Sequence, residues 1–173
     1  MRIIASGGLA SPLELTKKIN SFLYQSTGAD NYATFFYAQV HSAKRELRYV
    51  NAGHNPPYLF RACNSLREVT SQAPIEELKT GGTVIGMFPD SEYEEAVVEL
   101  CAGDVLLAFT DGVTEALNPG QVEFGASRLK SLLCRTAHLP VKEIVSCVSD
   151  ELRGWIAGAP QHDDLTFIVM KMN

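Results

Sequence analysis

The chain has 173 residues, 46% of them hydrophobic and 20% charged, which predicts a single globular domain over residues 1–173. Twenty acidic residues against fifteen Lys and Arg give a net charge of −5, and no basic stripe is present, so we exclude nucleic acid as the main partner. The absence of an 18-residue apolar run and of a secretory signal predicts no membrane partner and a cytoplasmic protein. The four cysteines lack metal-site or disulfide spacing, so we expect buried thiols at Cys63, Cys101, Cys134 and Cys147.

A helix followed by a hairpin is predicted in the first third of the chain. Ser11 is a capping residue, Pro12 suits the first helical position, and Glu14 stands three residues after the cap. Apolar residues then recur at helical spacing, which predicts a helix over 12–25. Residues 32–40 and 46–52 are rich in aromatic and β-branched residues and flank a polar break, so we expect a β-hairpin.

Further strands and then two helices are predicted in the rest of the chain. Strand patterns cover 57–61, 93–100 and 104–110, and such closely spaced strands usually form antiparallel sheets. Residues 124–135 and 141–155 show helical spacing, and a last strand is expected within 162–172. This order predicts an α+β layered sandwich in which the last strand returns to the sheet while the helices cover one face.

Two acidic dipeptides flank the predicted strands. Asp111 and Gly112 follow the hydrophobic run of 104–110, and Asp163 and Asp164 precede the last strand. By itself Asp-Gly is typical of a turn, and an isolated Asp-Asp pair is typical of a loop cap. If the two strands are antiparallel neighbours, however, the end of one lies beside the start of the other, and the acids converge.

Converging carboxylates predict a cation site. Unpaired carboxylates at a sheet end repel one another, and a hard divalent ion such as Mg²⁺ or Mn²⁺ relieves the repulsion. Asp111 and Asp163 are the candidate ligands, with Asp164 and Glu115 as additional acids nearby. Metal-activated water would then be the hydrolytic agent, because no G-x-S-x-G motif or assisted cysteine is present.

Two other loops are candidate functional sites. In "NAGHNPP" (51–57), His54 is either a phosphate- or water-orienting residue or a hydrogen-bonded structural histidine, and the structural interpretation is favoured. "GGTVIG" (81–86) lacks the spacing of known nucleotide-binding loops, so a turn into a strand is expected there.

Several stretches together resemble the metal-dependent PPM-type serine/threonine phosphatases, specifically their bacterial SpoIIE-like branch. The resemblance rests on "ATFFYAQV", "LRYVNAGHNPPYLF", "TVIGMFPDSEYEEAVVELCAGDVLLAFTDGVTEA", "FGASRL" and "DDLTFIV", which occur in the family's order.

The resemblance implies a fold, a metal site and a substrate class. The expected fold is an αββα sandwich with antiparallel sheets and two divalent ions, Mn²⁺ or Mg²⁺, at one end. Asp111 and Asp163 match the family's metal-binding aspartates and are therefore the expected catalytic and metal residues, while Gly112 would let the backbone approach the ions. The implied substrate is phosphoserine or phosphothreonine on a regulatory protein, often an anti-anti-sigma factor.

The start of the chain departs from the family pattern. The family's "GD-x-Y-D"-like and "GD-x-S-G-x-G"-like motifs are not found, so we expect the C-terminal two-thirds of the domain, without its first strands. Metal binding should then be weak, and exposed sheet surface predicts pairing with a missing segment or a second copy, as a homodimer.

Two alternatives to an active metal-dependent phosphatase therefore stay open. One is a non-catalytic, truncated phosphatase fold that acts as a protein-interaction module. The other is an unrelated, metal-independent hydrolase that uses His54 or His162.

Overall fold

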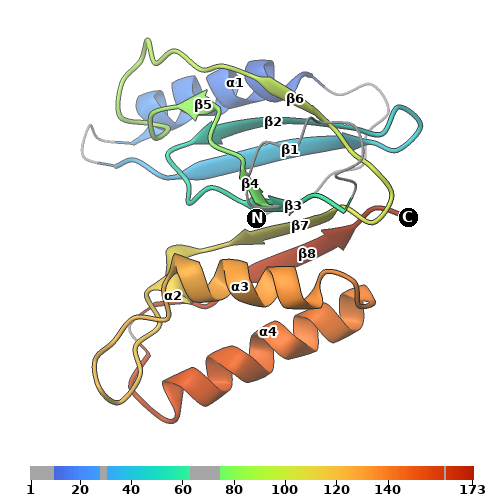
Figure 1. Cartoon of the computed structure of the whole chain (residues 1–173). Helices are drawn as coiled ribbons and strands as arrows, with labels where there is room; N and C mark the ends of the chain where they lie inside the picture. The colour runs from blue at the N-terminus through green and yellow to red at the C-terminus, as the bar shows by residue number, and fades with distance from the viewer. Residues whose placement is uncertain (1–9, 28–30, 63–74, 162) are drawn as a thin grey trace. The chain divides into compact units, whose positions relative to one another are not determined.

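The computed structural model describes residues 10–27, 31–62, 75–161 and 163–173. The described residues form two compact units, the first from those within 10–56 and 78–100 and the second from those within 57–77 and 101–173 (Figure 1). In the described ranges, no helix is both long enough and apolar enough to span a membrane.

In the described part of the first unit, helix α1 packs on a sheet of four strands. Strands β1 and β2 form the predicted antiparallel hairpin, with Phe35 opposite Ala52 and His41 opposite Glu46. Strand β6 is antiparallel to β2, and the two-residue strand β5 is parallel to it. The elements of this unit are α1 (Pro12–Ser26), β1 (Phe35–His41), β2 (Glu46–Ala52), β5 (Gly81–Gly82) and β6 (Ala96–Glu99).

Helix α1 begins as predicted. The Ser11 hydroxyl accepts from the Glu14 amide, the Glu14 carboxylate accepts from the Ser11 amide, and Pro12 occupies the first turn. These contacts satisfy amides that a helix start leaves without partners. The apolar face of α1 packs against a small core of Val50, Ala52, Ile85 and Tyr93.

The second unit is an antiparallel sheet in the order β4-β3-β7-β8, with helices α3 and α4 over one face (Figure 1). Its elements are β3 (Tyr58–Phe60), β4 (Ile75–Glu77), β7 (Val105–Phe109), α2 (Asp111–Thr114), α3 (Ala126–Thr136), α4 (Val141–Ile156) and β8 (Phe167–Lys171). Alternate residues of β7 (Val105, Leu107 and Phe109) join the core formed with both helices. The predicted return of the last strand to the sheet, beneath two helices, is confirmed.

Some local expectations were wrong. The short strands β4 and β5 were not predicted as strands, and β8 starts at Phe167, four residues after Asp163. Cys134 is exposed, and Cys101 and Cys147 are only partly buried, whereas Cys63 lies outside the described residues. On α3 the inward positions belong to Leu129, Leu132 and Leu133, so the next residue, Cys134, turns outward.

Candidate functional site

Asp111 lies at the surface, two residues after the end of β7. All five residues of β7 are buried, and the chain leaves the strand at Thr110 to enter the one-turn helix α2. Asp111 is the exposed first residue of α2, while Gly112 and Val113 behind it are buried. The Asp-Gly dipeptide therefore starts a helical turn and not a simple β-turn, because the chain continues into the core through Val113.

Pairing between β7 and β8 brings the second acidic dipeptide to the same place. Phe109 lies opposite Phe167, and beyond this pair the Thr110 amide donates to the Thr166 carbonyl at 2.9 Å. The segment 163–166, which leads into β8, therefore lies beside residues 110–112. The predicted antiparallel neighbourhood of the two strands is confirmed.

Gly112 allows a close approach between these two segments. A Cβ built on Gly112 would lie 2.6 Å from the Asp164 carbonyl oxygen and 3.4 Å from the Asp163 Cβ. Only a residue without a side chain leaves room for this contact. Gly112, the neighbour of Asp111, thus lies against the Asp163 Cβ. Among the described residues, the backbone that comes closest to Gly112 is that of Asp164.

Both carboxylates are held in the same way. Asp111 Oδ1 accepts from the Gly112 amide at 3.1 Å, and Asp163 Oδ1 accepts from the Asp164 amide at 2.7 Å. For either side chain, the described residues provide no donor to the second oxygen and no Lys or Arg partner. Each exposed aspartate therefore has one carboxylate oxygen available for a ligand.

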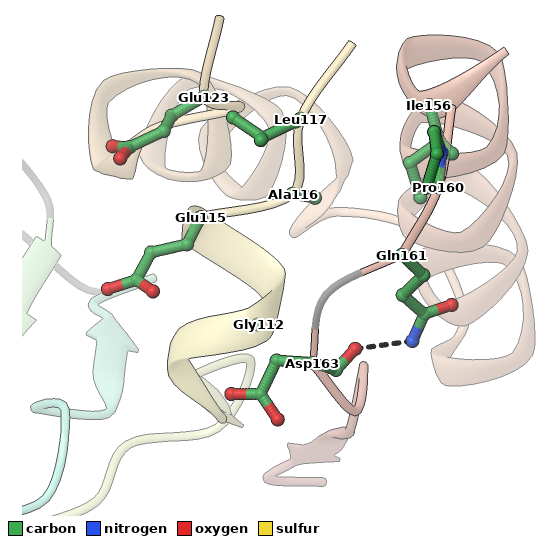
Figure 2. Close-up of a pocket in the computed structure, with 9 residues that line it drawn as sticks. All are labelled: Gly112, Glu115, Ala116, Leu117, Glu123, Ile156, Pro160, Gln161 and Asp163. Carbon is green, nitrogen blue, oxygen red and sulfur yellow. Dashed lines mark hydrogen bonds between the residues drawn. The ribbon is translucent and has the colours of Figure 1, made fainter. Parts of the chain in front are cut away.

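A pocket of about 220 Å³ lies next to Asp163. Three acids and several apolar residues line it, and none of these lining residues is Lys, Arg or His. The Gln161 side-chain amide donates to the Asp163 carbonyl at its edge (Figure 2). The lining residues are Gly112, Glu115, Ala116, Leu117, Glu123, Ile156, Pro160, Gln161 and Asp163.

The negative charge of the pocket lining limits which groups the pocket can bind. Glu115, named from the sequence as a nearby acid, lines the pocket, but Asp164 does not. With no basic residue in the lining, an anionic group that enters meets negative charge, hydrocarbon and the neutral Gln161 amide, but no positive charge. A bound phosphate would therefore need a cation beside it.

The carboxylates of Asp111 and Asp163 are the type of ligand that Mg²⁺ and Mn²⁺ prefer, but two side chains are too few to complete a coordination shell. Hard divalent ions prefer carboxylate oxygens, which Asp111 and Asp163 offer. Among the residues that the structure describes, however, no group of three or more His, Cys, Asp or Glu is arranged to hold a metal ion. These two aspartates supply part of a coordination shell, and water would have to supply much of the rest.

His54 lies in the first unit and has a structural environment. Its amide donates to Asn51 Oδ1 at 2.8 Å, and its ring Nδ1 donates to the Asn55 carbonyl at 2.9 Å. Asn51 in turn donates to the Leu78 carbonyl and is buried. These contacts support the structural interpretation of His54, and His162 lies outside the described residues.

Comparison with known proteins identifies the family. The sequence profile described as Stage II sporulation protein E (SpoIIE) matches residues 1–173. The chain belongs to the SpoIIE family. This SpoIIE-family chain is 34% identical over 143 residues to Protein IcfG of Synechocystis sp., a match that covers 82% of the chain and 21% of that relative.

A second relative is named as an enzyme. The chain is 29% identical over 161 residues to phosphoserine phosphatase RsbU of Bacillus subtilis, covering 92% of the chain and 45% of RsbU. The SpoIIE-family chain thus spans less than half the length of either of these curated relatives.

A solved structure shows the same fold. The SiaA-PP2C domain of Pseudomonas aeruginosa superposes with a TM-score of 0.78 at 20% identity, over 94% of this chain and 61% of that one. The SpoIIE-family chain therefore has the fold of a PP2C-type phosphatase domain. The α+β, PPM-like fold expected from the sequence is confirmed.

Sequence reasoning missed three residues around the acids. Thr110 bonds to the segment before β8, and Glu123 and Gln161 line the pocket. The role of Thr110 could have been predicted from its position between a buried strand and the Asp-Gly pair. A hydroxyl at the end of a strand can hydrogen-bond to the backbone of the neighbouring segment and so continue the pairing. Glu123 and Gln161 gave no local signal, since only the packing of α4 brings their loops together.

Proposed function

We propose that this chain is the catalytic part of a cytoplasmic, metal-dependent protein phosphatase that hydrolyses phosphoserine or phosphothreonine on a regulatory protein. The observation that carries the proposal is the position of Asp111 and Asp163 on two adjacent, hydrogen-bonded segments of a PP2C-type fold. Membership of the SpoIIE family and the similarity to RsbU, a phosphoserine phosphatase, support the substrate class. An anti-anti-sigma factor is the partner that the family resemblance suggests.

In this proposal Asp111 and Asp163 are the catalytic and metal-binding residues. Each would offer its free carboxylate oxygen to Mn²⁺ or Mg²⁺. Such ions, when bound, lower the pKa of a coordinated water and neutralise the charge of a phosphate. Gly112 keeps the two acidic segments together, and the pocket beside Asp163 would receive the part of the substrate that flanks the phosphate.

A second candidate function is a non-catalytic module that binds a regulatory protein through the same fold. It is favoured by the lack of a three-ligand group among the described residues. We also propose, as the reason for this shortage, that the domain is N-terminally incomplete, as the missing family motifs suggest. The two functions make opposite predictions for phosphate release.

One experiment separates the candidates. Phosphate release from a phosphoserine peptide is measured with Mn²⁺ and with chelator, for the native chain and for Asp111→Asn, Asp163→Asn and Asp150→Asn. Asp150 is a matched control, because it is an exposed acid on α4 that pairs with Arg153. The enzyme proposal expects release that needs Mn²⁺, survives Asp150→Asn and is lost in the other two variants.

The contrary results are equally specific. Mn²⁺ binding without any phosphate release supports the interaction module. Release that persists in chelator contradicts the metal proposal and favours a metal-independent hydrolase.

Association of two copies is a further part of the proposal. Strand β8 ends the sheet order of the second unit, so its outer edge has no strand partner among the described residues. On the edge strand β6 of the first unit, Val97 is 51% exposed. Unpaired edges favour strand addition from a second chain.

Sedimentation equilibrium tests for such a dimer. The chain is measured between about 5 and 100 μM, a range that brackets a micromolar Kd.

A further inference from the structure

Thr110 connects the two acidic segments through its side chain. Its hydroxyl donates to the Asp164 carbonyl at 2.8 Å and accepts from the Thr166 amide at 3.1 Å. The Thr110 amide also donates to the Thr166 carbonyl at 2.9 Å. The Thr110 hydroxyl also makes a longer contact of 3.4 Å with the Thr166 carbonyl, so one residue makes four contacts with the segment that carries Asp163.

This segment has few other means of being held in place. Asp163, Asp164 and Thr166 are all exposed, and only Leu165 packs against the core. The regular pairing of β7 with β8 ends at Phe109 and Phe167. The Gln161 side-chain amide donates to the Asp163 carbonyl. Beyond that contact, the hydrogen bonds of Thr110 extend the pairing with the β7 end to residue 164.

We infer that Thr110 is a positioning residue, which fixes Asp163 relative to Asp111 so that both carboxylates reach one divalent cation. That Thr110 fixes the position of Asp163 is inferred from the hydrogen bonds. That both carboxylates reach one cation rests on the proposed function. In this role Thr110 is not itself a ligand of the ion. It acts by restricting the backbone that follows Asp163, at residues 164 and 166, and such outer contacts typically change metal affinity by about 10- to 100-fold.

The first test measures Mn²⁺ affinity by titration calorimetry. Thr110→Val keeps the shape of the side chain and removes the hydroxyl, whereas Thr110→Ser keeps the hydroxyl. Thr114→Val is the matched control, because the Thr114 hydroxyl bonds to the Asp111 carbonyl at 3.1 Å within α2. We expect Kd to rise about 10-fold or more in Thr110→Val and to stay within about 3-fold in the other two, whose links to the 163–166 segment are intact.

Equal affinity of Thr110→Val and the native chain overturns the inference. An equal loss in Thr114→Val also overturns it, because the effect would then be general to α2. Should Thr110→Val fail to fold, Thr110→Ala carries the same expectation.

A second measurement works without metal and separates this inference from the proposed function. Hydrogen exchange is followed in chelator at the amides of residues 164–166 and of β8. In the native chain the Thr166 amide should be protected, and Thr110→Val should speed its exchange about 10-fold or more while β8 stays protected. If the native chain binds no Mn²⁺, the proposed function fails, and unchanged exchange at Thr166 would separately refute the positioning role.

Discussion

Gly112 and Asp164 approach so closely that a Cβ on Gly112 would lie 2.6 Å from the Asp164 carbonyl oxygen. Both partners in this contact belong to backbone segments that hydrogen bonds from Thr110 already tie together. Neither can withdraw without breaking those bonds. The contact therefore sets how near the two acidic segments come.

Gly112→Ala should push the segments apart. We expect a loss of about 1–3 kcal/mol in the free energy of unfolding, as for other overpacked sites, together with weaker Mn²⁺ binding. Urea denaturation and calorimetry measure the two effects. Gly154→Ala is the control, because Gly154 lies in helix α4 and a Cβ there meets nothing within 4 Å. This substitution should stabilise the chain by about 0.5–1 kcal/mol.

Replacing Asp111 with a neutral residue should leave the stability of the metal-free chain unchanged or raise it, although it weakens metal binding. Asp111, Asp163, Glu115 and Glu123 have no basic partner in the described part of the chain, so Asp111→Asn relieves repulsion among them. Without metal we expect the variant to be as stable as the native chain or more stable by up to about 1 kcal/mol. Thermal unfolding with chelator measures this difference.

The same variant should lose its response to Mn²⁺. At an ion concentration about one hundred times Kd, binding stabilises the native chain by about 2.7 kcal/mol. Asp111→Asn and Asp163→Asn should each show much less, and Asp150→Asn should respond like the native chain. A full response in the two site variants would show that the ion binds elsewhere.

Tyr58 should make stability depend on pH in the alkaline range. Burial, and secondarily the charge of Glu77, raises the pKa of Tyr58 from 10.0 to about 12. Above pH 10 the unfolded chain releases the phenol proton while the folded chain retains it, so the free energy of unfolding falls as pH rises toward 12. In Tyr58→Phe this fall should be smaller by at most about 1.4 kcal/mol per pH unit, as measured by urea denaturation; equal slopes would contradict the assignment.

Trp155 should determine the order of the loop between α2 and α3. Its indole N–H lies 3.2 Å from the carbonyls of both Ala116 and Val122, and the Arg128 guanidinium stacks 4.1 Å from the ring centroid. Trp155→Phe removes the donor, so we expect a loss of about 1–3 kcal/mol and faster proteolysis within residues 117–123. Val145→Ala, on an exposed position of α4, should change stability by less than about 0.5 kcal/mol.

The predictable parts of the fold were those with local signals. The capping residues Ser11 and Glu14 fixed the start of α1, and the all-apolar run of Val105–Phe109 identified a buried strand. Strand β5 was not predictable in this way, because Gly81 and Gly82 have low strand propensity and owe their pairing to tertiary neighbours, namely β2 and, at Gly82, Tyr93.

The candidate site was predictable in outline only. The position of Asp111 after a strand and of Asp163 before another was sufficient to infer that their segments meet. The start of α2 at Asp111 and the offset of four residues between Asp163 and β8 depend on tertiary packing. The contacts of Thr110 and Gly112 likewise appear only when the paired segments are seen together.

Asp111 and Asp163 are separated by 52 positions in the sequence (163 minus 111), and both α3 and α4 lie between them. During synthesis on the ribosome, Asp111 therefore emerges well before its counterpart. The acidic pair forms only after both helices have been made and β8 has added to β7, which is a contact of high sequence separation. A nascent chain that ends within α4 would carry the first carboxylate without the second, so any metal binding should begin late in translation.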